Sequence, residues 1–173
     1  MRAMKKVEQG LNTGFLLRWR PGVGDDLPPG GVLPGPNGIQ LSKDGTVAYV
    51  AIGGNEGEVR KIDLVTGATL GVAKVSHPDN ISWTPEGTLL VASLPPDSDT
   101  ASCMRQGFDR PCGAAFDIVE VDPKTMTRTI RLSHKGAPLG MATVAVRTRD
   151  ALYVGSAAGD RLLKTPLPGA AAP

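Results

Sequence analysis

The chain has 173 residues, of which 40% are hydrophobic and 21% charged, so its composition is that of a globular protein rather than a disordered one. Its formal net charge of +2 is too small to indicate a nucleic acid or an anionic membrane surface as partner. No apolar run approaches the roughly 20 residues of a membrane-spanning helix, so no membrane span is expected.

The N-terminal residues are basic, but no apolar segment follows them. Met1-Arg-Ala-Met-Lys-Lys leads into a polar stretch at residues 7–14, so no signal peptide is expected in these residues. These residues do not fix the localisation: the protein is cytoplasmic, or periplasmic or secreted if a signal precedes this segment. Residues 1–13 are expected to be a flexible end.

Three segments of the chain repeat one pattern of short strands. The first two, residues 37–51 and 79–92, are offset by 42 positions, so that Ile39 aligns with Ile81. A third copy runs through residues 142–155. Each copy has an alternating strand, a tight turn and then a more continuously apolar strand, which is typical of a strand buried on both faces.

Further strands are expected after each copy. A third strand is predicted at residues 58–63, 115–122 and 160–164, and a fourth at residues 68–75 and 126–132. No helical periodicity competes with this pattern. Four strands in about 40–45 residues is the period of a propeller blade. The sequence therefore predicts an all-β fold of the β-propeller type, and a β-sandwich is the alternative.

The repeats define one propeller region, 1–173, with about three blades of an expected six-bladed ring. The predicted boundaries are residues 32–75, 76–132 with an insertion at 94–114, and 137–167, followed by a flexible end at 168–173. Residues 14–20 are expected to complete the third blade or to be the last strand of another. Because propellers close with about four to eight blades and open sheet edges associate, we expect a fragment of a longer protein or self-association that completes the ring.

Both cysteines, Cys103 and Cys112, lie in the insertion. A local disulfide and two free thiols are both compatible with this spacing, and two cysteines without nearby histidines make a poor zinc site. His77 and His134 are expected to be solvent-exposed in loops. Neither Ser93 nor Ser156 lies in a Gly-x-Ser-x-Gly context, so the sequence gives no support to a serine-hydrolase triad.

Polar residues occupy matching positions at the start of two repeats. Asn37 precedes the first strand of one copy, and the pair Asp79 and Asn80 begins the equivalent strand of the next. The innermost strand of a propeller blade starts at the central channel, where such side chains converge. Their oxygens are ligands that Ca²⁺ prefers. Turn formation alone is the alternative role for each residue.

The same segments resemble the calcium-dependent six-bladed propellers. Pro36-Asn-Gly-Ile and Pro78-Asp-Asn-Ile, each followed by an acidic-Gly turn and a Val-Ala strand end, are similar to the gluconolactonase/regucalcin group, the paraoxonases (arylesterases) and the strictosidine-synthase-like proteins. The resemblance covers residues 32–167. It implies that Asn37, Asp79 and Asn80 bind Ca²⁺, and that Asp79 is the candidate catalytic base.

The resemblance further implies a hydrolase that acts on a small-molecule ester or lactone, with Met141 and Thr143 lining its pocket. Calcium would polarise the ester carbonyl in such a site. The alternative is a non-catalytic binding scaffold of the strictosidine-synthase-like type. Two departures favour that alternative: the family takes a Glu and another Asn from the first half of the ring, and Leu94 stands where a paraoxonase has His.

Overall fold

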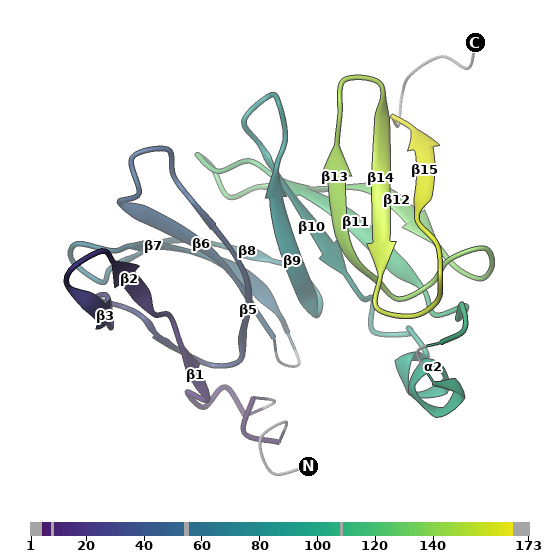
Figure 1. The fold of residues 1–173 in the computed structure, drawn as a ribbon, viewed down its shortest axis with the longest axis horizontal. Coiled ribbons are helices and arrows are strands. Elements are labelled where there is room, and N and C mark those ends of the chain that lie inside the picture. The colour runs from purple at the N-terminus through teal and green to yellow at the C-terminus, as the bar shows by residue number, and fades with distance from the viewer. Residues whose placement is uncertain (1–4, 8, 54–55, 108, 168–173) are drawn as a thin grey trace. The chain divides into compact units, whose positions relative to one another are not determined.

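The computed structural model describes residues 5–7, 9–53, 56–107 and 109–167. They form mainly short antiparallel strands joined by tight turns, which confirms the predicted all-β class (Figure 1). The chain divides into two compact units, Met1–Pro78 and Asp79–Pro173. Of the ends expected to be flexible, residues 1–4, 8 and 168–173 lie outside the described residues.

The first unit is built around a four-stranded sheet in which each strand pairs with its neighbour in sequence. Its strands are β5 (Pro36–Leu41), β6 (Val47–Ile52), β7 (Glu58–Asp63) and β8 (Thr69–Lys74). The β6 strand is almost wholly buried, as its continuous apolar sequence predicted. At the edge of the sheet, β8 leaves Leu70 and Val72 exposed.

Residues 14–20 form two short strands instead of one. The β1 strand (Gly14–Phe15) pairs with β4 (Val32–Leu33), and β2 (Arg18–Arg20) pairs with β3 (Gly24–Asp26). Arg18 and Arg20 both donate to the carboxylate of Asp26 across the second pair. The segment therefore pairs inside the first unit, whereas one of the two alternatives had it completing the third repeat.

The second unit contains two sheets, again with strands in sequence order. The four-stranded sheet consists of β9 (Pro78–Trp83), β10 (Leu89–Ser93), β11 (Phe116–Val121) and β12 (Arg128–His134). The other consists of β13 (Ala142–Arg147), β14 (Ala151–Ser156) and β15 (Leu163–Pro166). Side chains from both sheets form one core, in which Phe116 is completely buried.

The turns between the third and fourth strands are alike in the two four-stranded sheets. Asp63 accepts hydrogen bonds from the backbone N–H groups two and three residues further on, and Asp122 does the same. Hydrogen bonds to a carboxylate favour its charged form, and those from Thr66 and Val65 hold the pKa of Asp63 below its usual range. The two repeats therefore share the hydrogen bonds of this turn as well as the order of their strands.

The insertion at residues 94–114 connects β10 to β11 and contains a helix, α2 (Thr100–Gln106), where the sequence indicated none. Seven residues are too few to show a helical period, so the helix depends on its end contacts. Asp99 supplies one, because its carboxylate accepts from the backbone N–H of Ser102 at 2.9 Å. No helix in the described part of the chain has the length and apolar character needed to cross a membrane.

Candidate functional site

The pair Asp79 and Asn80 lies at the start of β9, directly after a sharp turn of the chain. His77 has a φ of 38°, a left-handed conformation that non-glycine residues seldom adopt, and Pro78 follows it. Asp79 is partly buried in the sheet, whereas Asn80 is exposed. The turn therefore brings both side chains to the end of the strand, where a ligand has access to them.

Two acceptors hold the amide group of Asn80 in one orientation. Its Nδ2 donates to Asp79 Oδ1 at 3.2 Å and to the carbonyl oxygen of Thr143 at 2.9 Å. Because the two hydrogens of the amide nitrogen are used in this way, its oxygen Oδ1 is the atom that is left to meet a ligand. The structure thus brings together three of the predicted site residues, Asp79, Asn80 and Thr143.

A β-bulge explains why the Thr143 carbonyl is able to accept from Asn80. Ala142 pairs with Ser156 and Val144 with Gly155, so that Thr143 is an extra residue in β13. The extra residue of a bulge is not paired by the ladder, and bulges commonly re-aim groups beside functional sites. The bulge in β13 therefore makes the Thr143 carbonyl available to accept the hydrogen bond from Asn80.

Ser82 makes a second connection of the same kind, which the sequence analysis did not identify. Its Oγ donates to the carbonyl oxygen of Ala145 at 2.6 Å. Asn80 and Ser82 are two residues apart, so they share one face of β9, and both donate to the backbone of β13. Alternating polar residues on the first strand of a repeat were the available signal.

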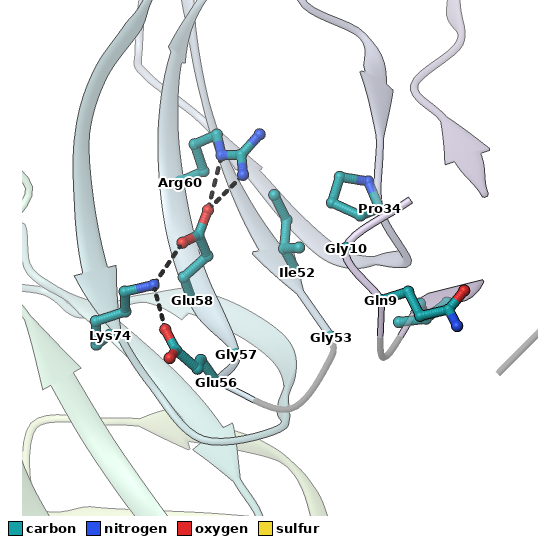
Figure 2. A pocket seen from close by; sticks show the side chains of 11 residues that line it. Gln9, Gly10, Pro34, Ile52, Gly53, Glu56, Gly57, Glu58, Arg60 and Lys74 are labelled. Atoms are coloured by element: carbon teal, nitrogen blue, oxygen red, sulfur yellow. Dashed lines mark hydrogen bonds and ion pairs between the residues drawn. The ribbon is translucent and has the colours of Figure 1, made fainter. Parts of the chain in front are cut away.

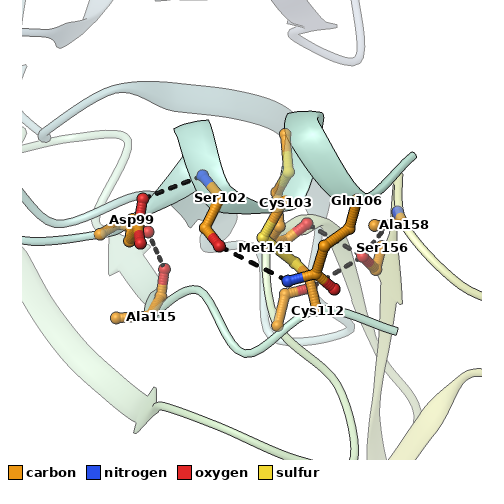
Figure 3. Close-up of a disulfide and its surroundings, with 11 residues drawn as sticks. Asp99, Ser102, Cys103, Gln106, Cys112, Ala115, Met141, Ser156 and Ala158 are labelled. Atoms are coloured by element: carbon orange, nitrogen blue, oxygen red, sulfur yellow. Dashed lines mark hydrogen bonds between the residues drawn. A yellow bond between two sulfur atoms is a disulfide. The ribbon is translucent and has the colours of Figure 1, made fainter. Parts of the chain in front are cut away.

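The other predicted pocket residue, Met141, is buried against the disulfide-bearing insertion (Figure 3). Cys103 and Cys112 are joined by a disulfide, which settles the alternatives left by their spacing. Met141 has a φ of 52°, and its backbone N–H donates to the carbonyl of Ala114 at 3.0 Å. Ser156 Oγ donates to the carbonyl of Met141 from the other side. The insertion thus fixes the residue that precedes β13.

Asn37 lies in the first unit, in an irregular part of β5. Pro36 pairs with Ile52 and Ile39 with Val50, which leaves one extra residue in β5 at this point. The Asn37 side chain is exposed. Asn37 and the Asp79 pair belong to different units, so their convergence on one ion stays a prediction.

The donor set is chemically suited to a hard cation. Asp79 offers a carboxylate, and Asn80 and Asn37 offer amide oxygens, which are the ligand types that Ca²⁺ takes. With a single carboxylate the set is short of the usual six to eight ligands, so backbone carbonyls and water would have to supply the rest. Among the described residues, no cluster of three or more His, Cys, Asp or Glu side chains could hold a metal.

A cavity of about 440 Å³ lies in the first unit, at the end of the sheet where β5 begins (Figure 2). Glu58, which is largely buried, accepts from Arg60 at 2.6 Å and from Lys74 at 3.3 Å. Lys74 also pairs with Glu56 at 3.2 Å. Two acidic and two basic side chains balance each other, so this cavity is polar without favouring one sign of charge.

The structure corrects one expectation about the histidines and serines, namely the position of His134. His134 was expected in an exposed loop, but it is the last residue of β12 and is half-buried, with its ring 5.4 Å from that of Phe116. His77 is exposed, as expected. The Ser156 hydroxyl donates to the carbonyls of Gly140 and Met141, so it has a structural role at the start of β13.

No protein-family model matches the sequence, and a search of curated proteins finds no match either. Among solved structures, the chain is similar to luciferin-regenerating enzyme, a β-propeller, with a TM-score of 0.50 and 16% sequence identity. The similarity covers 85% of this chain and 46% of the other, so the chain spans about half the length of that enzyme. At this identity the likeness concerns the fold alone, which is propeller-like.

Proposed function

We propose that the chain is about half of a six-bladed, calcium-dependent propeller that hydrolyses small esters or lactones, of the gluconolactonase and arylesterase type. The observation that carries the proposal is the Asp79–Asn80 pair, in which Asn80 is oriented by Asp79 and by the Thr143 carbonyl. With the amide nitrogen engaged in this way, the Asn80 oxygen is the atom that remains for an ion. The similarity to luciferin-regenerating enzyme supports a propeller-like fold, but it gives no support to calcium-dependent hydrolysis.

In this proposal each residue has a defined role. Asp79, Asn80 and Asn37 hold the ion by their side-chain oxygens, and Thr143 keeps the Asn80 amide in place. Bound calcium would supply a positive charge that polarises the carbonyl of the substrate. A carboxylate has two oxygens, so Asp79 is able to bind with one and accept a proton from the attacking water with the other. The water oxygen would then form the new acyl bond as the ester C–O bond breaks, and the leaving alkoxide would take the proton from Asp79.

Calcium should stabilise the chain and support hydrolysis, and Asp79→Asn should remove both effects. We expect a melting temperature that rises with Ca²⁺, by an amount equivalent to about 2.7 kcal/mol at a hundred times the Kd. Hydrolysis of phenyl acetate and γ-butyrolactone should fall about 100-fold or more in the variant, since a positioned base contributes at least that factor. Thermal unfolding and initial rates, with calcium and with EDTA, provide the measurements.

Asp150→Asn is the matched control, because Asp150 is exposed in the turn between β13 and β14 and makes the same change of charge. It should behave like the unaltered chain. If calcium shifts the melting temperature of neither the unaltered chain nor Asp150→Asn, the metal site is contradicted. If calcium stabilises the chain without hydrolysis of either substrate, the non-catalytic binding scaffold is the better function. The cross-strand bond from Asn80 to Thr143 favours that second candidate, since it gives the pair a structural purpose.

We also propose that a second copy completes the ring when this chain stands alone. The chain covers 46% of a propeller of similar fold, so a second copy would supply about the length that is missing from such a ring. Sedimentation equilibrium should therefore give twice the monomer mass. A single monomeric species at micromolar concentrations would contradict this arrangement.

A further inference from the structure

The second unit has another cavity, of about 220 Å³, whose lining comes from both of its sheets. It lies at the opposite end of β13 from Thr143, since it is reached by the last residue of that strand, Arg147. Thr143 and Arg147 are four positions apart, or roughly 13 Å along the strand. The residues that line it are Leu90, Glu120, Arg131, Arg147, Leu152 and Leu167. The cavity is therefore separate from the candidate calcium site.

Glu120 is a nearly buried carboxylate in the wall of this cavity, with a side chain 10% exposed. It accepts from the Thr88 hydroxyl and from Arg131 Nε, each at 2.5 Å. Burial alone raises the pKa of Glu120, but these two hydrogen bonds and the charges of Arg131 and Arg147 outweigh it and place the pKa below its usual range. Glu120 is therefore ionised at neutral pH.

A β-bulge places Arg131 beside Glu120. Ile118 pairs with Leu132 and Val119 with Ile130, so Arg131 is the extra residue of β12. In a regular ladder, the arginine would follow the strict alternation of the strand and face away from the core. The bulge turns it to the side of Glu120, where it lines the cavity.

Arg147 supplies a donor whose acceptor is missing. Its Nε is buried and has no hydrogen-bond partner among the described residues. Its Nη2 pairs with the exposed Glu86 at 3.2 Å, whereas the neighbouring Nε makes no hydrogen bond. A buried N–H without an acceptor is destabilising, so this position calls for one.

The lining residues carry two positive charges and one negative charge, beside three leucine side chains. We propose that the cavity binds a small aliphatic monocarboxylate. Its carboxylate accepts from the guanidinium groups of Arg147 and Arg131, and its alkyl chain packs on the partly exposed Leu167. Guanidinium groups bind carboxylates through paired N–H donors, which explains the residue type. An inorganic anion would make no apolar contact with Leu167.

Binding should appear as saturable stabilisation of the full chain by sodium butyrate. We expect the melting temperature to rise with butyrate, and to change much less with equal concentrations of sodium chloride or 1-butanol, which lack the alkyl chain or the charge. The Nε–H resonance of Arg147 should shift with the same dependence on butyrate in a ¹⁵N–¹H spectrum. An unsaturable effect, or an equal effect of chloride, would overturn the proposal.

Arg147→Met tests the contact directly, because methionine keeps much of the aliphatic stem and removes the guanidinium. Butyrate affinity should fall about tenfold or more, the usual effect of losing a hydrogen bond to a charged group. Arg128→Met is the matched control, since Arg128 is exposed on β12 and does not line the cavity. Unchanged affinity in Arg147→Met would overturn the proposal. If that variant fails to fold, the Arg147 resonance in the unaltered chain decides.

Discussion

Phe116→Ala should lower the free energy of unfolding of the chain by about 3–5 kcal/mol. Phe116 is completely buried at the start of β11, in a core to which β10, β13 and β14 also contribute. Truncation removes the packing of a large ring and leaves a cavity that β-sheets on both sides cannot collapse to fill. It also removes the surface on which the His134 ring rests. Urea unfolding followed by circular dichroism would measure the change.

Phe15→Ala is the matched control, because the Phe15 side chain is 60% exposed on the short strand β1. The same chemical change should there alter the free energy of unfolding by less than about 0.5 kcal/mol. A loss below about 1 kcal/mol in Phe116→Ala would mean that the two sheets of the second unit do not share a core.

Removing the disulfide should have the second largest effect. The double variant Cys103→Ala and Cys112→Ala should lose about 2–3 kcal/mol, because the bridge restricts the unfolded chain across a separation of nine residues. For a chain of this size, that corresponds to a melting temperature lower by about 5–10 °C. Alanine is chosen since both sulfur atoms are buried and serine would leave hydroxyl groups without acceptors.

The loss should be concentrated where the insertion contacts β13. Met141 packs on the bridge and donates to Ala114, so its amide should exchange faster with solvent in the double variant. Dithiothreitol should lower the melting temperature of the unaltered chain to that of the variant, and should leave the variant unchanged. Equal stability of the oxidised and reduced forms would contradict a structural role for the bridge.

Most strands were predictable from sequence because apolar periodicity and turn residues are local signals, but the strand expected at residues 160–164 is observed at Leu163–Pro166. The fourth strand expected at residues 68–75 is observed as Thr69–Lys74, and the apolar strand expected to be buried on both faces is β6. The repeats also share a polar feature, because Asp63 and Asp122 start the same kind of turn at matching positions.

The contacts that give each site its character were not predictable in this way. Arg131 reaches Glu120 only because a bulge adds one residue to β12, and nothing in the local alternation reveals that shift. The sequence around Ser82 does not reveal that its hydroxyl donates to the backbone of β13, because that contact depends on which strand lies next to β9. The helix α2 is shorter than a helical signal requires. For the candidate site, Asp79, Asn80 and Thr143 were found together, and Asn37 stays a prediction.

The bulges at Asn37 and at Thr143 have a consequence for anyone who designs a repeat protein from this chain. Averaging the repeats into one consensus sequence would favour a regular ladder, in which each residue of the first strand has a single partner. Such a protein would gain backbone pairing, and the carbonyl of Thr143 would turn into that ladder. Asn80 would then lose its anchor, so the most regular version of this fold would be the one least suited to the proposed ion site.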